Sequence, residues 1–331
     1  MAVQTTESQT LTLDSVFLDH YIVPDYQRGF VWEHREVQRL LDDILRQYSA
    51  TQDPDNEYFI GASVVTPAIN GGYEVIDGQQ RLATMFLFFA AIRDYLRRLG
   101  AKPIEDIDEK LLGWVVDPAG NRMQRHRVVL GFEDSTTLLQ KIAQDGAHID
   151  DIKATTRSIE NIVSAYKTHG EFLDANFGRD LEAIRQFYGF VTGHVKTVRI
   201  RTGTVTRALQ MFETVNHRGV SLESMDLLKN LLFMYAAREQ YPILRNRWKE
   251  LVDKLYVSAK MEKGYQRDRQ YRFMMYFLRS TYKVQDMKED AMYDWFLKNE
   301  YQCHYKTQPL EFMDKMLDAA TSSYYRAGAG G

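Results

Sequence analysis

The chain has 331 residues, 44% of them hydrophobic and 26% charged, which is an ordinary globular composition at a length sufficient for two domains. Its formal net charge of -3 excludes a strongly cationic nucleic-acid binder, so a DNA site would have to be a local basic patch. The single cysteine, Cys303, excludes an internal disulfide and favours a reducing, cytoplasmic setting.

The first hundred residues alternate predicted strands and helices. The polar segment 1–10 lacks the apolar core of a signal peptide, and we expect it to be disordered. Apolar residues at helical spacing predict the helices, and strand-like runs on either side of Asn70-Gly71-Gly72 predict a pair of strands. In chain order, the expected elements are a helix at 33–48, strands at 58–65 and 73–76, and a helix at 79–98.

The most apolar stretch, residues 82–92, lies inside the second of these helices. It is about half the length that a membrane span requires, and arginines flank it. We therefore expect a helix buried in a protein core and no association with a membrane.

Beyond Gly100 the pattern becomes mainly helical, except that alternating apolar residues predict a strand at 194–201. The expected organisation is a strand-and-helix core at 1–100, a mainly helical domain at 101–326 and a linker-like tail at 327–331. We expect the helical domain to complete a ligand pocket that the core begins. Further helices are expected at 204–215, 223–237, 242–256, 265–282, 287–299 and 308–320.

Two polar segments beside short apolar runs carry the candidate chemistry: residues 24–32, and Asp77-Gly78-Gln79-Gln80-Arg81 between a strand and a helix. Gly78 lets the backbone approach a ligand closely, and the unpaired N–H groups at a helix start favour an anion. The planar guanidinium of Arg81 suits a phosphate, and Asp77 is placed to hold a divalent metal or to orient a water.

Each polar segment also has a purely structural interpretation. Asp77 before a glycine is typical of a turn in which the aspartate caps the helix, and Arg28 and Arg81 would fit surface ion pairs. A third polar segment, 212–222, contains residues 216–219, which would fit a simple turn between helices. The sequence has no Gly-rich P-loop and no cysteine and histidine cluster with zinc spacing.

These segments belong to an ordered series of motifs: Pro24-Asp25-Tyr26-Gln27-Arg28-x-x-x-Trp32, Phe59-Ile60-Gly61, Asp77 to Arg81, Phe212-Glu213-x-Val215-Asn216-x-Arg218-Gly219-x-x-Leu222 and Asp226-Leu227-x-Lys229-Asn230. The series, over about residues 11–235, resembles the DGQQR-motif N-terminal domain of GmrSD-type modification-dependent restriction enzymes, a family that includes phosphorothioate-sensing antiphage proteins. More distantly, Tyr26-Gln27-Arg28 and Gly78-Gln79-Gln80-Arg81 are similar to the paired boxes that line a nucleotide pocket in the ParB and sulfiredoxin superfamily.

The resemblance implies an α+β fold with a ParB/sulfiredoxin-like N-terminal core, followed by a mainly helical domain. It also implies a nucleoside triphosphatase that uses Mg²⁺ and an NTP, with GTP favoured over ATP. The expected catalytic residues are Asp77, Gln79, Gln80 and Arg81, and Asp77 is also the expected metal ligand. The expected nucleotide-binding residues are Gln27, Arg28, Gly78, Thr84, Asn216 and Arg218.

Contacts with DNA are expected from one loop and two basic stretches. An aromatic notch beside an arginine would accept the larger, less hydrated sulfur of a phosphorothioate, although Tyr26 and Trp32 would equally fit packing beneath the pocket. The loop residues expected to sense the modification are Tyr26, Gln27, Arg28, Phe30 and Trp32. The residues expected to contact DNA phosphates are Lys196, Arg199, Arg201, Arg269, Arg272 and Arg279, and Arg122, Arg125 and Arg127 form a smaller basic patch.

The helix at 265–282 would present its basic residues on one face and Phe273, Met274, Phe277 and Leu278 on the side facing the core. A solvated helix face with no ligand would fit this pattern equally well.

The favoured function is sensing of modified DNA coupled to NTP hydrolysis, which regulates an HNH-type nuclease. No His-Asn-His arrangement occurs in the sequence, so the nuclease is expected to be another domain or subunit. The alternative is a non-catalytic adaptor whose pocket binds nucleotide or DNA phosphate without turnover. The expected partners are double-stranded DNA and the nuclease, and a homo-oligomer is left open.

Overall fold

The computed structural model describes residues 6–24, 27–50, 56–68, 71–116, 119–131, 133–145, 149, 152–205, 207–209, 211, 224–257, 266–285 and 287–328. The chain divides into two compact units, residues 1–204 and 205–331. The boundary that the sequence suggested near residue 100 falls inside the first unit, and each unit is described by itself.

A six-stranded sheet forms the centre of the first unit, in the order β1-β8-β3-β4-β2-β7. Strand β2 runs parallel to both of its neighbours, β4 and β7, whereas β3 is antiparallel to β4 and parallel to β8. Strand β1 closes the far edge antiparallel to β8. The strands are β1 (Glu7–Thr12), β2 (Tyr21–Val23), β3 (Tyr58–Pro67), β4 (Tyr73–Asp77), β7 (Val128–Leu130) and β8 (Val195–Arg201).

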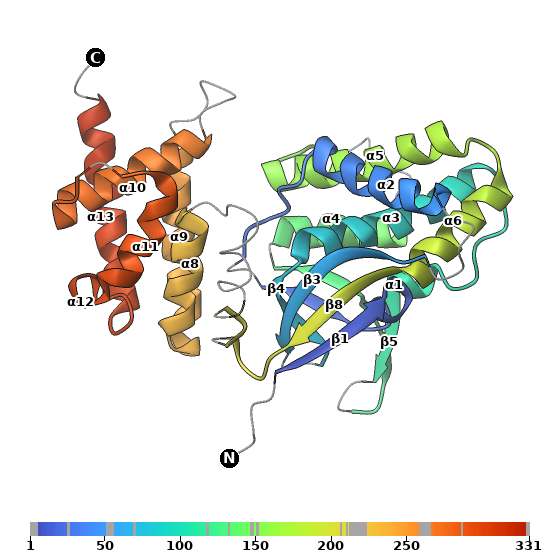
Figure 1. Cartoon of the computed structure of the whole chain (residues 1–331), viewed down its shortest axis with the longest axis horizontal. Helices are drawn as coiled ribbons and strands as arrows, with labels where there is room; N and C mark the ends of the chain where they lie inside the picture. The colour runs from blue at the N-terminus through green and yellow to red at the C-terminus, as the bar shows by residue number, and fades with distance from the viewer. Residues whose placement is uncertain are drawn as a thin grey trace. The chain divides into compact units, whose positions relative to one another are not determined.

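Helices cover this sheet, so the unit has the α+β fold that the sequence predicted. Figure 1 shows α2 to α6 gathered on one side of the sheet. The helices of the first unit are α1 (Leu13–Val16), α2 (His34–Ser49), α3 (Gln79–Arg98), η1 (Asp108–Lys110), α4 (Glu133–Gln144), α5 (Arg157–Asn176) and α6 (Leu181–His194).

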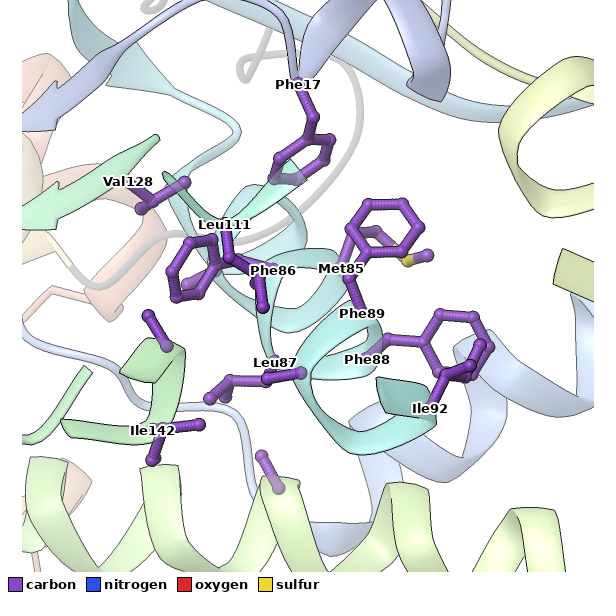
Figure 2. Close-up of a cluster of buried hydrophobic side chains, with 14 of the residues drawn as sticks. Phe17, Met85, Phe86, Leu87, Phe88, Phe89, Ile92, Leu111, Val128 and Ile142 are labelled. Atoms are coloured by element: carbon purple, nitrogen blue, oxygen red, sulfur yellow. The ribbon is translucent and has the colours of Figure 1, made fainter. Parts of the chain in front are cut away.

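Helix α3 is the central element of the core, and it is buried on nearly all sides as its apolar sequence predicted. Figure 2 shows its side chains surrounded by residues from other elements, among them Phe17, Leu111 and Val128. Phe89 packs edge-on against Phe17 at 5.0 Å between ring centroids. Burying an aromatic side chain of this size stabilises the fold by roughly 1.5–3 kcal/mol. Among the described residues, no helix is long and apolar enough to cross a membrane.

Two expectations from the sequence were wrong. Residues 7–10, which we expected to be disordered, form most of β1, because pairing with β8 supplies hydrogen-bond partners that local composition does not reveal. The segment after Gly100 is mainly helical, as expected, but β8 is not its only strand. It also contains β5 (Leu112–Val116), β6 (Arg122–His126) and β7, of which β5 and β6 form a separate two-stranded sheet.

The second unit is helical in its described part. Phe277 and Phe296 both meet Phe312 edge-on, at 5.6 and 5.9 Å between ring centroids, and they form the aromatic centre of this unit. The helices are α8 (Ser224–Tyr235), η3 (Arg238–Gln240), α9 (Tyr241–Val257), α10 (Gln266–Tyr282), α11 (Glu289–Lys298), α12 (Glu300–Cys303) and α13 (Pro309–Gly328).

Candidate functional site

The carboxyl ends of the parallel strands β2 and β4 lie at the same edge of the sheet. Strand β2 leads into the loop that carries Gln27 and Arg28, and β4 ends at Asp77, directly before α3. Ligands in open sheets of this type bind at the carboxyl ends of parallel strands. The topology therefore brings together the two polar segments that the sequence singled out.

Gly78 makes the turn between β4 and α3 possible. Its backbone is left-handed, with φ 92° and ψ 3°. A Cβ atom at this position would lie 2.9 Å from the Cβ atom of Ser63 in β3, which is closer than real Cβ contacts. Only glycine therefore allows the helix to begin so close to the sheet.

The start of α3 has no side-chain cap among the described residues, and its first turn contains no acidic residue. The alternative in which Asp77 caps this helix is therefore not what the structure shows. The first backbone N–H groups of α3 retain their capacity to donate, and the helix dipole favours an anion at this position.

Asp77 lies beside two arginines. Burial raises the pKa of its carboxyl group, and the charge of Arg81, the backbone N–H of Gly78 and the charge of Arg28 oppose that rise, in decreasing order. The two guanidinium groups therefore lie close enough to Asp77 to act on its ionisation. A carboxylate within electrostatic reach of two cations, at an uncapped helix start, is suited to holding Mg²⁺ and phosphate together.

Strand β3 positions the guanidinium of Arg81. Arg81 donates to the carbonyl oxygen of Ala62. A Cβ atom on Gly61 would lie 3.1 Å from the Nη1 atom of Arg81, so the absence of a side chain at Gly61 makes room for the guanidinium. The pairing of β3 with β8 shifts register between Phe59 and Ala62, at the same place. This contact gives a physical reason for the glycine of the Phe59-Ile60-Gly61 motif.

Gln80 holds the loop that follows β2. Its Oε1 atom accepts from the backbone N–H of Val31 at 2.9 Å and of Trp32 at 3.4 Å. Its Nε2 atom donates to the carbonyl oxygen of Gly29 at 3.0 Å. The side chain acts as one more peptide unit paired with residues 29–32, so these contacts position the loop and do not point the amide toward a ligand.

Two other glutamines retain unused polar atoms. Gln79 donates through Nε2 to the carbonyl oxygen of Arg28 at 3.3 Å, but its buried Oε1 atom has no hydrogen-bond partner among the described residues. The buried Nε2 atom of Gln27 likewise has no hydrogen-bond partner among the described residues. The two side chains are 8% and 6% exposed, and an unpaired buried polar atom costs about 1–3 kcal/mol. Such atoms are available to a polar partner, which can be a water or a ligand.

Residues of α5 support the same loop, although sequence reasoning did not find them. The backbone N–H of Phe30 donates to Oγ of Ser158 at 3.0 Å, and Nδ2 of Asn161 donates to the carbonyl oxygen of Phe30 at 3.3 Å. These partners are more than a hundred positions apart in the chain and share no motif, so no local signal could have identified them.

The described loop aromatics belong to the core. Phe30 is 2% exposed, and Trp32 is partly buried against the core cluster. For these two residues the structure favours the packing interpretation over contact with DNA. Thr84 is fully buried inside α3, so it does not face the open helix start. Tyr26, Asn216 and Arg218 lie outside the described residues, as does the side chain of Arg269.

The cations of β8 are paired within the chain. Lys196 pairs with Glu57, and Arg199 pairs with Asp19 and lies 4.5 Å from the ring centroid of Tyr73. Arg201 pairs with Glu7 at 3.5 Å. Contact between these side chains and DNA phosphate would have to compete with carboxylates that are already in place.

Helix α10 has the two-sided character that its sequence predicted. Arg272 and Arg279 are exposed. The four residues predicted to face the core are buried, as listed here: Phe273, Met274, Phe277 and Leu278. Whether the exposed face contacts DNA stays a prediction.

A small cavity of about 30 Å³ adjoins the junction between β4 and α3. Its wall is largely apolar, with contributions from Gly78, Arg81 and Ser63. It has room for about one water molecule, so a nucleotide would have to bind at the open side of the junction. No group of three or more His, Cys, Asp or Glu side chains that could hold a metal occurs among the described residues.

A search of curated proteins finds no match to this chain. A family model does match, over residues 10–233, which is more than half of the chain and includes both polar segments of the junction. The model describes the N-terminal domain of the GmrSD restriction endonuclease. The chain therefore belongs to the GmrSD N-terminal domain family and is a component of a restriction system.

Proposed function

We propose that the junction between β4 and α3 binds a nucleoside triphosphate with Mg²⁺ and hydrolyses it. The observation that carries this proposal is the grouping of Asp77, Arg28 and Arg81 at the uncapped start of α3. A partly buried carboxylate, two cations and the backbone donors of a helix start are parts that phosphoryl transfer uses repeatedly.

Each group has a distinct role in the proposal. The first N–H groups of α3 bind phosphate oxygens, and Arg81 and Arg28 stabilise the charge that develops during transfer. The unpaired atoms of Gln27 and Gln79 supply further polar contacts once the loop adjusts to the ligand. Gln80 acts indirectly, because it holds the loop in place.

The donor set at Asp77 fits a metal that arrives with its substrate. Mg²⁺ is commonly bound by one or two carboxylates together with phosphate oxygens, and it does not require a protein cage. Asp77 would supply the carboxylate. The bound metal would neutralise phosphate charge, and the residues of this chain would orient the phosphates.

The proposal extends to control by DNA. Membership of a restriction family connects the chain to DNA and to a nuclease. We propose that modified DNA, with phosphorothioate as the first probe, raises the rate of hydrolysis and so regulates an HNH-type nuclease. GTP is the first nucleotide to test, and ATP is the second.

Phosphate release in Mg²⁺ tests the catalytic proposal. Asp77→Ala and Arg81→Ala should each lower the rate about a hundredfold, as expected when a main charge-stabilising group is lost. Arg81→Lys keeps a positive charge and most of the side chain, so it separates loss of charge from loss of packing against Gly61. Circular dichroism and thermal melting of each variant check that it folds.

Arg179→Ala is the matched control, because Arg179 is an exposed arginine between α5 and α6. It should hydrolyse at the wild-type rate. Equal rates in the wild type and both junction variants would remove the junction from the active site. Tight Mg²⁺–nucleotide binding without phosphate release would support the non-catalytic adaptor instead.

Phosphorothioate and unmodified duplexes of one sequence test the regulatory part. Greater stimulation by the modified duplex supports sensing of that modification. Identical stimulation curves would remove phosphorothioate from the proposal and leave the hydrolysis test unaffected.

A further inference from the structure

The β5–β6 hairpin exposes large apolar side chains. It is a two-stranded sheet separate from the central one, and Figure 1 shows β5 extending beyond the body of the unit. Trp114, Val116 and Met123 are 57%, 67% and 50% exposed. Exposed apolar side chains gathered on one small element are a usual mark of a binding surface.

The strand register determines which hairpin side chains share a face. Trp114 pairs with Gln124, and Val116 pairs with Arg122, so these four residues lie on one face of the ribbon. The guanidinium of Arg122 lies over the ring of Trp114, 5.0 Å from its centroid. An indole, an arginine and an amide are therefore presented together on an exposed surface.

The hairpin strands carry positive charge only. Their sequences, LGWVV and RMQRH, contain Arg122 and Arg125 and no acidic residue. The cations of β8 pair with the carboxylates of Glu57, Asp19 and Glu7 on neighbouring elements. In the hairpin, Arg122 lies over the ring of Trp114, and Arg125 donates to the carbonyl oxygen of Gly71 at 3.1 Å. The two strands are thus complementary in charge to a polyanion, and the segment that connects them carries one acidic residue, Asp117.

Hydrogen bonds of Arg127 fix the base of the hairpin to the rest of the unit. Arg127 donates to the carbonyl oxygens of Glu109, at 2.9 Å, and of Leu18, at 2.5 Å. A Cβ atom on Gly113 would lie 2.3 Å from the guanidinium carbon of Arg127, so glycine lets that side chain pass beneath β5. The carbonyl oxygen of His126 also contacts Nδ1 of His20 at 3.1 Å. A ribbon anchored in this way loses little further freedom when it binds.

We propose that the β5–β6 hairpin inserts into a groove of duplex DNA. A two-stranded ribbon fits the major groove, which is about 12 Å wide. Arg122 contacts phosphates, Gln124 contacts base edges, and Trp114 packs against sugars or thymine methyl groups. The proposal does not depend on NTP hydrolysis at the junction.

The proposed DNA contact and the β4–α3 junction lie at opposite ends of the parallel strands. The hairpin leads into the amino end of β7, whose Val128 pairs with Tyr21 at the amino end of β2. The junction lies at the carboxyl ends of β2 and β4. Variants of the hairpin should therefore change DNA binding and leave basal hydrolysis unchanged.

The test is binding of the full chain to a short fluorescent duplex, measured by anisotropy over a range of salt concentrations. Trp114→Ala combined with Arg122→Ala should weaken binding about tenfold or more. Arg122→Ala alone should reduce the slope of log K against log salt by about 0.9, the contribution of one phosphate contact. Tyr301→Ala, which removes an exposed aromatic of α12, and Arg179→Ala are the matched controls and should bind like the wild type.

Sedimentation of the same proteins separates DNA from a protein partner. Loss of self-association in the hairpin variants, with DNA affinity retained, would overturn the proposal in favour of an interface between copies of the chain. Affinity and salt slope equal to those of the wild type would also overturn it, as would a wild-type chain that binds no duplex. Phosphate release is measured in parallel. Its outcome tests the proposed NTP hydrolysis and does not depend on whether the hairpin binds DNA.

Discussion

Two arginines lie at opposite ends of the parallel strands of the central sheet, and they have different roles. Below, the amino edge is the side where these strands begin, and the carboxyl edge is the side where they end. At the amino edge, Arg127 is 8% exposed and donates to two backbone carbonyls, and burial lowers the pKa of its guanidinium. At the carboxyl edge, Arg81 donates to the carbonyl of Ala62 and acts on the ionisation of Asp77. The first arrangement stabilises the fold, and the second brings positive charge to the proposed ligand site.

The comparison shows that the surroundings of an arginine matter more than its presence in a basic stretch. Sequence grouping placed Arg122, Arg125 and Arg127 in one patch, although Arg122 is exposed and Arg127 is part of the core. The same grouping suggested that β8 contacts DNA, although its cations pair with carboxylates of the chain. Only the packing around each side chain separates these roles.

The largest effect on stability is expected from Arg127→Ala. It would leave the carbonyls of Glu109 and Leu18 without their donors, so the free energy of unfolding should fall by about 3 kcal/mol. Denaturant unfolding measures the change. Arg122→Ala, at an exposed position of the same hairpin, is the control and should change stability by less than about 0.5 kcal/mol. Equal effects of the two substitutions would end the distinction between a structural and an exposed arginine at this edge.

A smaller loss is expected from Gln80→Leu at the carboxyl edge. The substitution leaves the backbone of Gly29 and Val31 unpaired, so the free energy of unfolding should fall by about 2 kcal/mol and hydrolysis should fall with it. Gln38→Leu is the matched control, because the amide of Gln38 bonds only to Asp42 on the surface of α2 in the described contacts. Unfolding and phosphate release are measured on both variants. Wild-type hydrolysis in Gln80→Leu would show that the loop does not need this contact.

The smallest effect, and one of opposite sign, is expected from Asp77→Asn. Burial raises the pKa of Asp77 in the folded state, so its neutral form favours folding. That contribution is fully present below the unfolded pKa of about 3.8 and is lost as the pH rises through the folded pKa. The uncharged variant should therefore melt higher than the wild type at neutral pH, while it loses hydrolysis.

Melting temperatures from neutral to acid pH check this prediction. The difference between Asp77→Asn and the wild type should shrink as the pH falls through the folded pKa. A variant that melts lower than the wild type at neutral pH would mean that the two arginines outweigh burial. Binding sites often contain groups that lower the stability of the fold. In that case the carboxylate of Asp77 would not be such a group.

Local pattern predicted most of the regular elements. The apolar run at 82–92 predicted a buried helix, and α3 is the centre of the core, because a helix with apolar side chains on all sides must be enclosed. The alternation at 194–201 predicted β8 for a similar reason. By contrast, β1 and β7 have little local signal, because their stability depends on partners far along the chain.

By itself, the sequence determined the family, the α+β class and the two polar segments, because these depend on residue order and local periodicity. Only the tertiary structure decided that Gln80 and Phe30 support the loop, that Gly61 makes room for Arg81, and that Arg127 is structural. These roles depend on which side chains meet across the sheet. Long-range packing sets those meetings, and no local sequence window contains both partners.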